Sequence, residues 1–149
     1  MTPEGWGPPI WTLFHVLAQK IREDKYVELG PQLFFFIKRI SRYLPCPDCS
    51  NHATSFLNKI DGSKLKSKAD LINTIYVMHN LVNMRKKKQM HATSVLDNYK
   101  NINIIQAYNG FAGVYKTRGN MKLLTDTFQR QLIIKDFKKW LVTNLIYFQ

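Results

Sequence analysis

The 149-residue sequence has only two cysteines, few glycines and prolines, and 10 acidic residues against 22 basic ones. With only two cysteines, the chain cannot be a small fold that is stabilised by several disulfides. Seven glycines and six prolines exclude collagen-like and Pro/Gly-rich disordered chains. No segment reaches the ~20 apolar residues of a membrane span. The 45% apolar fraction nevertheless suffices for a packed core.

The N-terminal stretch MTPEGWGPP lacks the basic and apolar regions of a secretory signal. We therefore expect a soluble chain made without an export signal and with no membrane partner. Disulfides rarely persist in such a compartment, and a C-x-x-C pair found there is more often metal-binding or catalytic.

The net charge of +12 favours acidic partners, namely nucleic acid, anionic lipid or a phosphate-bearing cofactor. The densest basic runs are RKKK (Arg85 to Lys88) and KLKSK (Lys64 to Lys68). Taken alone, such a run is better explained as a solvated helix end than as a ligand site. No nucleic-acid-binding motif or basic-aromatic interleaving is present, so a nucleic-acid partner is unlikely.

Hydrophobic residues recur at helical spacing along the whole chain, which predicts an all-α fold. We expect a bundle of four to five helices with a C-terminal helical extension. Pro8 and Pro9 are expected to begin the first helix, and Pro31 the second. The second should end before Leu44-Pro45, and Ser67 with Asp70 resembles a capping box that opens a long fourth helix.

We divide the sequence into residues 1–99, a bundle domain, and residues 100–149, a helical extension that serves as a cap or an interaction surface. The segment from Ala92 to Tyr115 is expected to form one helix with a weak point at Gly110. KTRGN is read as a turn. A final helix from Met121 to Phe148 should bury a stripe of six residues: Leu124, Phe128, Leu132, Phe137, Leu141 and Leu145.

The two cysteines, Cys46 and Cys49, form a C-x-x-C motif at the predicted start of the third helix. The helix dipole and unpaired amides stabilise a thiolate there. A zinc site would need His52, and His79 or His91, as further ligands. An inert buried pair is the plainest alternative. A redox dithiol is the third, and it requires an electron acceptor.

The fourth predicted helix carries a polar stripe of Tyr76, His79, Asn83 and Lys87, with Asn80 beside it. Rings, amides and cations in this order suit an aromatic, phosphate-bearing cofactor. A solvated polar face would show the same periodicity. In the first helix Trp11 and His15 share one face, an arrangement that is more often core than cofactor site.

Three motifs in register resemble the FAD-linked sulfhydryl oxidases of the Erv/ALR type. They are WGPPIWTLFH (Trp6 to His15), LPCPDCSNHA (Leu44 to Ala53) and HNLVNMRKKK (His79 to Lys88). The family shows W-G-x-x-x-W-x-x-x-H, then C-x-x-C with a histidine commonly three residues later, then H-N-x-V-N followed by lysine. The short forms of large DNA viruses are the most similar.

This resemblance implies an FAD-dependent thiol oxidase that makes disulfides and reduces molecular oxygen to hydrogen peroxide. Cys46 would exchange with a substrate dithiol, and Cys49 would pass electrons to FAD. The implied FAD-binding residues are Gly7, Trp11, His15, Cys49, His52, His79, Asn80, Val82, Asn83, Lys87 and Lys88. Weaker matches are Tyr43, Arg85 and Tyr99.

The chain departs from many members of this family because it lacks a second, shuttle cysteine pair. The resemblance therefore implies either direct contact between Cys46 and a dithiol protein or a separate small C-x-x-C shuttle protein. It further implies a homodimer and activity in the cytoplasm of an infected host cell, with packaging in the virion. The alternative function is a non-catalytic zinc-binding or basic scaffold module.

Overall fold

The computed structural model describes residues 3–116 and 124–149, and every regular element in these ranges is helical. The all-α prediction is thus confirmed for the part of the chain described. The α-helices are α1 (Pro3–Lys20), α2 (Tyr26–Arg42), α3 (Pro47–Asn58), α4 (Lys68–Arg85), α5 (Ile104–Tyr115) and α6 (Leu124–Thr143). Short 3-10 helices are η1 (Glu23–Lys25), η2 (Gly62–Lys64), η3 (Thr93–Tyr99) and η5 (Leu145–Phe148).

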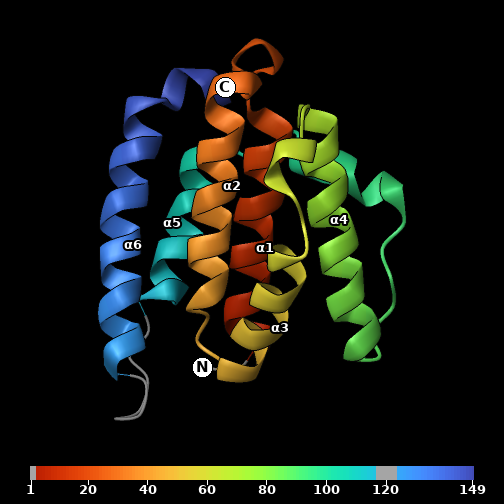
Figure 1. The fold of residues 1–149 in the computed structure, drawn as a ribbon, viewed down its shortest axis with the longest axis vertical. Helices are drawn as coiled ribbons and strands as arrows, with labels where there is room; N and C mark the ends of the chain where they lie inside the picture. Colours follow the sequence, from red (N-terminus) through yellow and green to blue (C-terminus); the bar gives the residue numbers. More distant parts are fainter. Residues whose placement is uncertain (1–2, 117–123) are drawn as a thin grey trace.

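Helices α1 and α2 lie side by side at the centre of the bundle (Figure 1). Helix α4 packs against α1 on one side and α6 packs against α2 on the other, while α5 covers α1. The short helix α3 lies across the end of the bundle near the N-terminus and contacts α2. None of the described helices is both long enough and apolar enough to cross a membrane.

The predicted starts of the first two helices were wrong, because both helices begin earlier and contain their prolines. A proline removes only its own N–H bond to the carbonyl four residues before it. Burial of Trp6 extends α1 across Pro8 and Pro9. Burial of Tyr26 extends α2, since its ring lies so close to Gly30 that an added Cβ would be 2.6 Å from it.

The segment after α4 is not one helix with a weak point at Gly110. It forms η3 and then α5, with the break at residues 100–103. The side chain of Asn103 accepts hydrogen bonds from the amides of Ile105 and Gln106, at 2.8 and 3.2 Å, and so caps α5. Asparagine is among the residues most favoured as a helix N-cap, which explains why α5 begins here. Gly110 lies inside α5 as an exposed residue.

The C-terminal helix was predicted, but its buried face was partly wrong. Phe137 and Leu141 are buried, while Phe128 and Leu132 are exposed. The inward face is instead formed by Arg130, Ile133, Ile134, Phe137 and Leu141. The side chain of Leu124, like the KTRGN turn apart from Lys116, lies outside what the structure describes.

Specific contacts join the segment after residue 99 to the bundle. The Tyr115 hydroxyl donates to the Ile40 carbonyl at 2.9 Å, and the Trp140 indole donates to the Gln32 side chain at 2.7 Å. Arg39 and Asp136 form an ion pair at 3.1 Å. We therefore propose that residues 100–149 complete the hydrophobic core rather than form a separate unit.

Phe137→Ala tests that proposal. Phe137 is fully buried among Phe36, Phe111 and Trp140. Its truncation should lower the free energy of unfolding of the whole chain by about 3–5 kcal/mol. Denaturant unfolding followed by circular dichroism measures this. The matched control is Phe128→Ala on the same helix, 60% exposed, which should change it by less than about 0.5 kcal/mol. A separate, early unfolding step of α6 in the Phe137 variant would contradict the proposal.

Candidate active site

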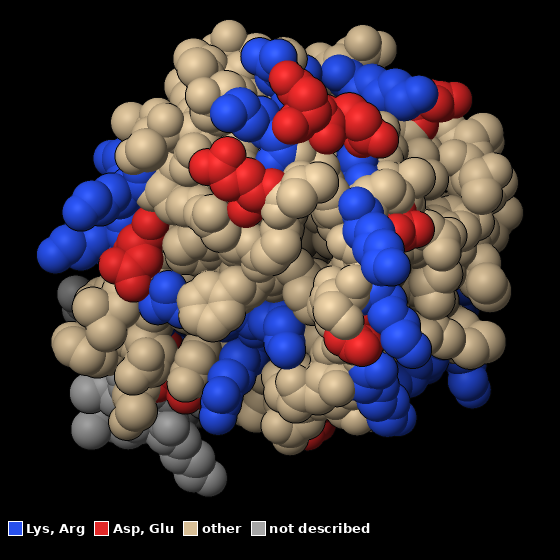
Figure 2. Space-filling view, turned by 45° about the horizontal axis from the view of Figure 1, so that its top comes forward, with Lys and Arg blue, Asp and Glu red and all other residues tan. Residues whose placement is uncertain are grey.

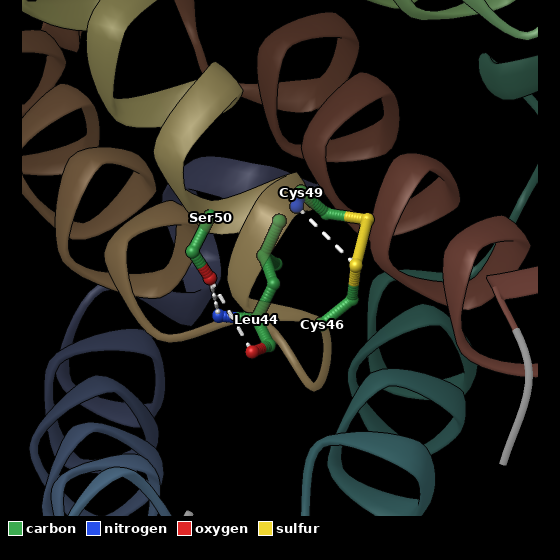
Figure 3. The surroundings of a disulfide bond; sticks show 4 residues. All are labelled: Leu44, Cys46, Cys49 and Ser50. Carbon is green, nitrogen blue, oxygen red and sulfur yellow. Dashed lines mark hydrogen bonds between the residues drawn. A yellow bond between two sulfur atoms is a disulfide. The ribbon is translucent and has the colours of Figure 1, made fainter.

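The cysteine pair lies at the N-terminus of α3, as predicted. Cys46 is the N-cap residue, Pro47 occupies the first helical position, and the two cysteines are joined by a disulfide with Cα atoms 5.2 Å apart (Figure 3). The backbone amide of Cys49 donates to the sulfur of Cys46 at 3.3 Å. A thiolate formed at Cys46 on reduction would keep this donor and the positive end of the helix dipole, both of which favour the charged form.

Ser50 holds the chain in the turn before Cys46. Its hydroxyl accepts from the Leu44 amide at 2.8 Å and donates to the Leu44 carbonyl at 3.3 Å (Figure 3). Both residues are buried. This reciprocal pair satisfies two backbone groups where α2 has ended and α3 has not begun. Sequence reasoning missed Ser50 because a serine in the first turn of a helix is common.

Cys49, but not Cys46, lines a narrow cavity of about 50 Å³ between α1, α3 and α4. Its walls include the predicted residues Gly7, Trp11 and Val82. A Cβ built on Gly7 would meet no atom within 4 Å, so this glycine leaves open space on the cavity side of α1. The asymmetry predicted for the pair is thus present, with one sulfur toward an internal space.

A second hollow of about 240 Å³ shares Ala53, Met78, Val82 and Arg85 with this cavity. It runs between α3 and α4 and is lined by His52. The two hollows therefore lie on either side of these shared side chains of α3 and α4. Tyr43 lines neither of them and lies instead in a groove between α2 and α3.

Three polar atoms in α1, α2 and α4 are buried without a hydrogen-bond partner among the described residues. They are the Trp6 indole nitrogen, the Ser41 hydroxyl and the side-chain nitrogen of Asn83. Trp6 and Ser41 both line the cavity. Because an unsatisfied buried donor is costly, this cluster suits a ligand that presents polar atoms on a flat apolar body.

The predicted aromatic and histidine residues form one stack between α1 and α4. The rings of Trp11 and His79 lie parallel with centroids 4.1 Å apart, and those of His15 and Tyr99 with centroids 4.4 Å apart. His15 Nε2 lies 3.0 Å from His79 Nδ1. One of these two nitrogens must carry a proton and donate the hydrogen bond, and the other must be unprotonated and accept it, so at most one of the two rings is charged when they are bonded.

Burial keeps both of these histidines uncharged. Desolvation is the largest cause and lowers the pKa of His15 to about 3, with the charges of His79 and His91 adding to it. The pKa of His79 falls to about 4, again mainly through desolvation and then through His91 and Lys88. The stack therefore behaves as a neutral, apolar wall near pH 7.

Asn80 fixes the segment after α4 rather than facing the cavity. Its side chain accepts from the His91 amide at 2.8 Å and donates to the His91 carbonyl at 3.0 Å. The Tyr76 hydroxyl donates to the same carbonyl at 2.7 Å. These bonds occupy the Asn80 amide and place His91 edge-on against His79. Asn80 therefore supports the stack indirectly.

The predicted cations lie at the C-terminus of α4. Lys87 has a φ of 57°, and the amides of Lys87 and Lys88 donate to the carbonyls of Met84 and Asn83 at 3.1 and 2.8 Å. This is a Schellman ending. It turns the chain so that Lys87 and Lys88 are exposed beside the stack, while Arg85 and Lys86 line the cavity.

The zinc reading finds no support in this arrangement. Within residues 3–116 and 124–149, no three His, Cys, Asp or Glu side chains are grouped so as to hold a metal ion. Cys46 and Cys49 are paired with each other, and His79 is stacked on Trp11.

A disulfide at a helix N-terminus, beside an aromatic-lined cavity in a helical bundle, is the arrangement expected of a helical dithiol–disulfide protein. The sequence model of the Erv1 / Alr family matches residues 8–102, and this chain belongs to that family. The match covers α1 to η3 and ends before α5.

Individual relatives come from large DNA viruses. The FAD-linked sulfhydryl oxidase of African swine fever virus is 30% identical over 97 residues, which cover 65% of this chain and 78% of that protein. A protein of Invertebrate iridescent virus 3, whose name also includes FAD-linked sulfhydryl oxidase, is 28% identical over 100 residues, covering 66% and 68%. No solved structure matches the chain significantly.

The histidine stack predicts a stability that decreases in mild acid. An unfolded histidine titrates near pKa ~6.5, whereas the folded values are about 3 and about 4. Below pH 6.5 these two histidines bind protons in the unfolded chain but stay unprotonated in the folded chain. The free energy of unfolding should fall by about 1–3 kcal/mol between pH 7 and pH 5, with the share of His79 reduced by its partial exposure.

Urea unfolding at several pH values measures this decrease. His79→Phe keeps a ring against Trp11 but removes one titrating group, so the decrease should become clearly smaller. An unchanged pH dependence in that variant would show that His79 does not contribute.

Proposed function

We propose that this protein is an FAD-dependent thiol oxidase that forms disulfides in protein substrates. The observation that carries the proposal is the position of Cys49, bonded to Cys46 at the start of α3 and lining the cavity formed with Gly7 and Trp11. A disulfide that only braced the fold would not need one sulfur beside a space with unsatisfied donors. Family membership and the names of the relatives agree with this activity.

The residues around the cavity fit FAD. The buried donors of Trp6 and Asn83 and the hydroxyl of Ser41 suit the ring heteroatoms of a flavin. The exposed cations Lys87 and Lys88 suit a pyrophosphate. We assign cofactor contacts to the full predicted set: Gly7, Trp11, His15, Cys49, His52, His79, Asn80, Val82, Asn83, Lys87 and Lys88. Within it, Asn80 acts through the His91 backbone.

The ring stack also suits a planar ligand. Trp11 on His79 and His15 on Tyr99 already make parallel contacts, so a bound ring would replace one of them with a similar contact. This exchange conserves buried apolar area. The same exchange explains why the cavity is narrow in this structure, in which these rings lie against each other.

The chemistry of the chain itself is thiol–disulfide exchange. A substrate thiolate attacks the Cys46 sulfur, a mixed disulfide forms, and Cys49 leaves as a thiolate. The second substrate thiolate then attacks the substrate sulfur of the mixed disulfide and releases Cys46. The substrate gains a disulfide, and Cys46 and Cys49 hold its two electrons as a dithiol.

When bound, FAD supplies the two-electron acceptor for this dithiol and delivers the electrons to molecular oxygen, with release of hydrogen peroxide. The neutral stack of His15 and His79 forms part of the wall that would enclose such a group. The amide of Cys49 stabilises negative charge on the Cys46 sulfur, which makes this sulfur a better leaving group when the second substrate thiolate attacks the mixed disulfide.

The substrate meets Cys46 directly or through a small C-x-x-C shuttle protein. We further propose a homodimer, for which the outer face of α4 provides an apolar surface in Val77, Leu81 and Met84, 39%, 42% and 57% exposed. Action in the cytoplasm of an infected cell and packaging in the virion stay predictions from the viral resemblance. A non-catalytic scaffold is the alternative, and it would neither bind flavin nor oxidise dithiols.

Substitution of each cysteine tests whether both sulfurs are needed for the reaction. Cys49→Ser and Cys46→Ser should each reduce dithiol-dependent oxygen consumption by about 1,000-fold or more, because exchange needs both sulfurs. FAD content, read from the visible absorption of the purified variants, should stay at the level of the unmodified protein. Full turnover in the Cys49 variant, or dithiol oxidation at the original rate in the Cys46 variant, would contradict the assignment.

Gly7→Leu tests the cofactor site without touching a reactive group. The new side chain would occupy the open space on the cavity side of α1, so FAD uptake should fall by about 100-fold or more while the helical content is kept. Gly113→Leu is the matched control, because the space beside this α5 glycine is also open but does not line the cavity. Equal FAD uptake by the two variants would exclude the proposed position.

A further inference from the structure

A groove of about 760 Å³ separates α2 from α3 on a different face of α3 from the Cys49 cavity. Its volume is well above the 50 Å³ of the Cys49 cavity and the 240 Å³ of the hollow beside it. Of the residues predicted to contact the cofactor, only the weaker match Tyr43 lines it. It therefore needs a separate explanation.

The groove is basic. Lys38, Arg39 and Arg42 line it, and no acidic side chain is among its described lining residues. Arg39 has a carboxylate partner in Asp136 at 3.1 Å. Neither Lys38 nor Arg42 forms an ion pair with a described residue; instead, they lie near the rings of Phe34 and Tyr43.

This composition differs from that of the face drawn in Figure 2. On the face drawn in Figure 2, lysine and arginine side chains are widespread, but carboxylates lie among them. Cations gathered in a concave surface with no lining carboxylate produce a stronger local potential than the same cations on a convex surface. The groove therefore favours an acidic ligand.

The opposite wall of the groove can bind an extended chain. Asn51, Thr54, Ser55 and Asn58 line it from α3, at the i, i+3, i+4 and i+7 positions of one helix face. Their amides and hydroxyls can donate to and accept from a peptide backbone. Phe35, 59% exposed, adds an apolar contact at the α2 side.

The groove reaches the redox pair. Tyr43 and Asn51 line it, three residues before Cys46 and two residues after Cys49. Three residues of chain span at most about 10 Å. A peptide lying in the groove can thus bring a cysteine a few residues away to the sulfur of Cys46.

We propose that the α2–α3 groove docks an acidic segment that flanks the cysteines of the dithiol substrate protein. This inference rests on the proposed function and specifies its substrate class. The bonds formed and broken are those of the exchange at Cys46. The groove contributes association and orientation, so it should affect kcat/KM for peptides according to their charge.

A charge-reversal experiment on the FAD-loaded protein tests this. Two synthetic peptides carry the same C-x-x-C dithiol, one flanked by Asp and Glu and the other by Lys and Arg. The readout is the ratio of kcat/KM for the acidic peptide to that for the basic peptide, at 0.15 M salt, where distant charges are screened. A general loss of structure would lower both values together and leave the ratio unchanged.

The test variant is Lys38→Glu with Arg42→Glu, and the control is Lys64→Glu with Lys66→Glu. The control makes the same change in net charge beside η2. Leu65 lies between the two control lysines, and its carbonyl accepts a hydrogen bond from the Tyr26 hydroxyl at the first turn of α2. We expect the ratio to favour the acidic peptide in the unmodified protein. It should fall about 10-fold or more in the test variant and stay within about twofold in the control.

Three outcomes would overturn the inference. One is an unmodified ratio near unity, and another is an equal fall in both double variants, which would indicate a general field effect. The third is a test variant that loses affinity for a single-stranded oligonucleotide while its peptide ratio is unchanged, because the groove would then bind nucleic acid. Failure of the unmodified protein to oxidise dithiothreitol would instead contradict the proposed function, so the two failures are distinguishable.

Discussion

The chain reversal between α2 and α3 is the constraint on which the rest of the site depends. Pro45 prevents α2 from continuing, and the reciprocal bonds between Ser50 and Leu44 hold the reversal closed. Cys46 consequently becomes the N-cap of α3, where the free amides of the first turn surround its sulfur. Cys49, three residues on, is turned toward the cavity. In the proposed function, one turn of backbone thus separates the sulfur that exchanges with substrate from the sulfur that faces the internal acceptor.

Much of this site was predictable because its signals are local. Helical periodicity gave the all-α class, and proline with C-x-x-C gave the start of α3. Spacing i, i+3 and i+4 placed His79 and Asn83 on α4, and both lie near the cavity in the structure. The capping box of Ser67 and Asp70 is present as predicted. Each of these depends on residues within one or two helical turns.

The features that were not predicted depend on contacts between distant residues. Arg130 is 1% exposed in α6, and its guanidinium lies 3.4 Å from the Tyr43 carbonyl, next to the reversal. Hydrophobic periodicity does not predict that an arginine is buried. We therefore placed Phe128 and Leu132, and not Arg130, on the inward face of the helix. The same applies to Asn80, whose partner is the backbone of residue 91. Sequence spacing identifies a helix face but not the segment that will cover it.

The most direct test of the account is the absorption spectrum of the purified protein, before and after anaerobic addition of a dithiol. The account predicts flavin bands at about one FAD per chain that bleach with the dithiol and return on admission of air. A colourless protein that does not take up added FAD would contradict it. So would a yellow protein whose bands do not respond to dithiol, since the Cys46–Cys49 pair would then not communicate with the cofactor.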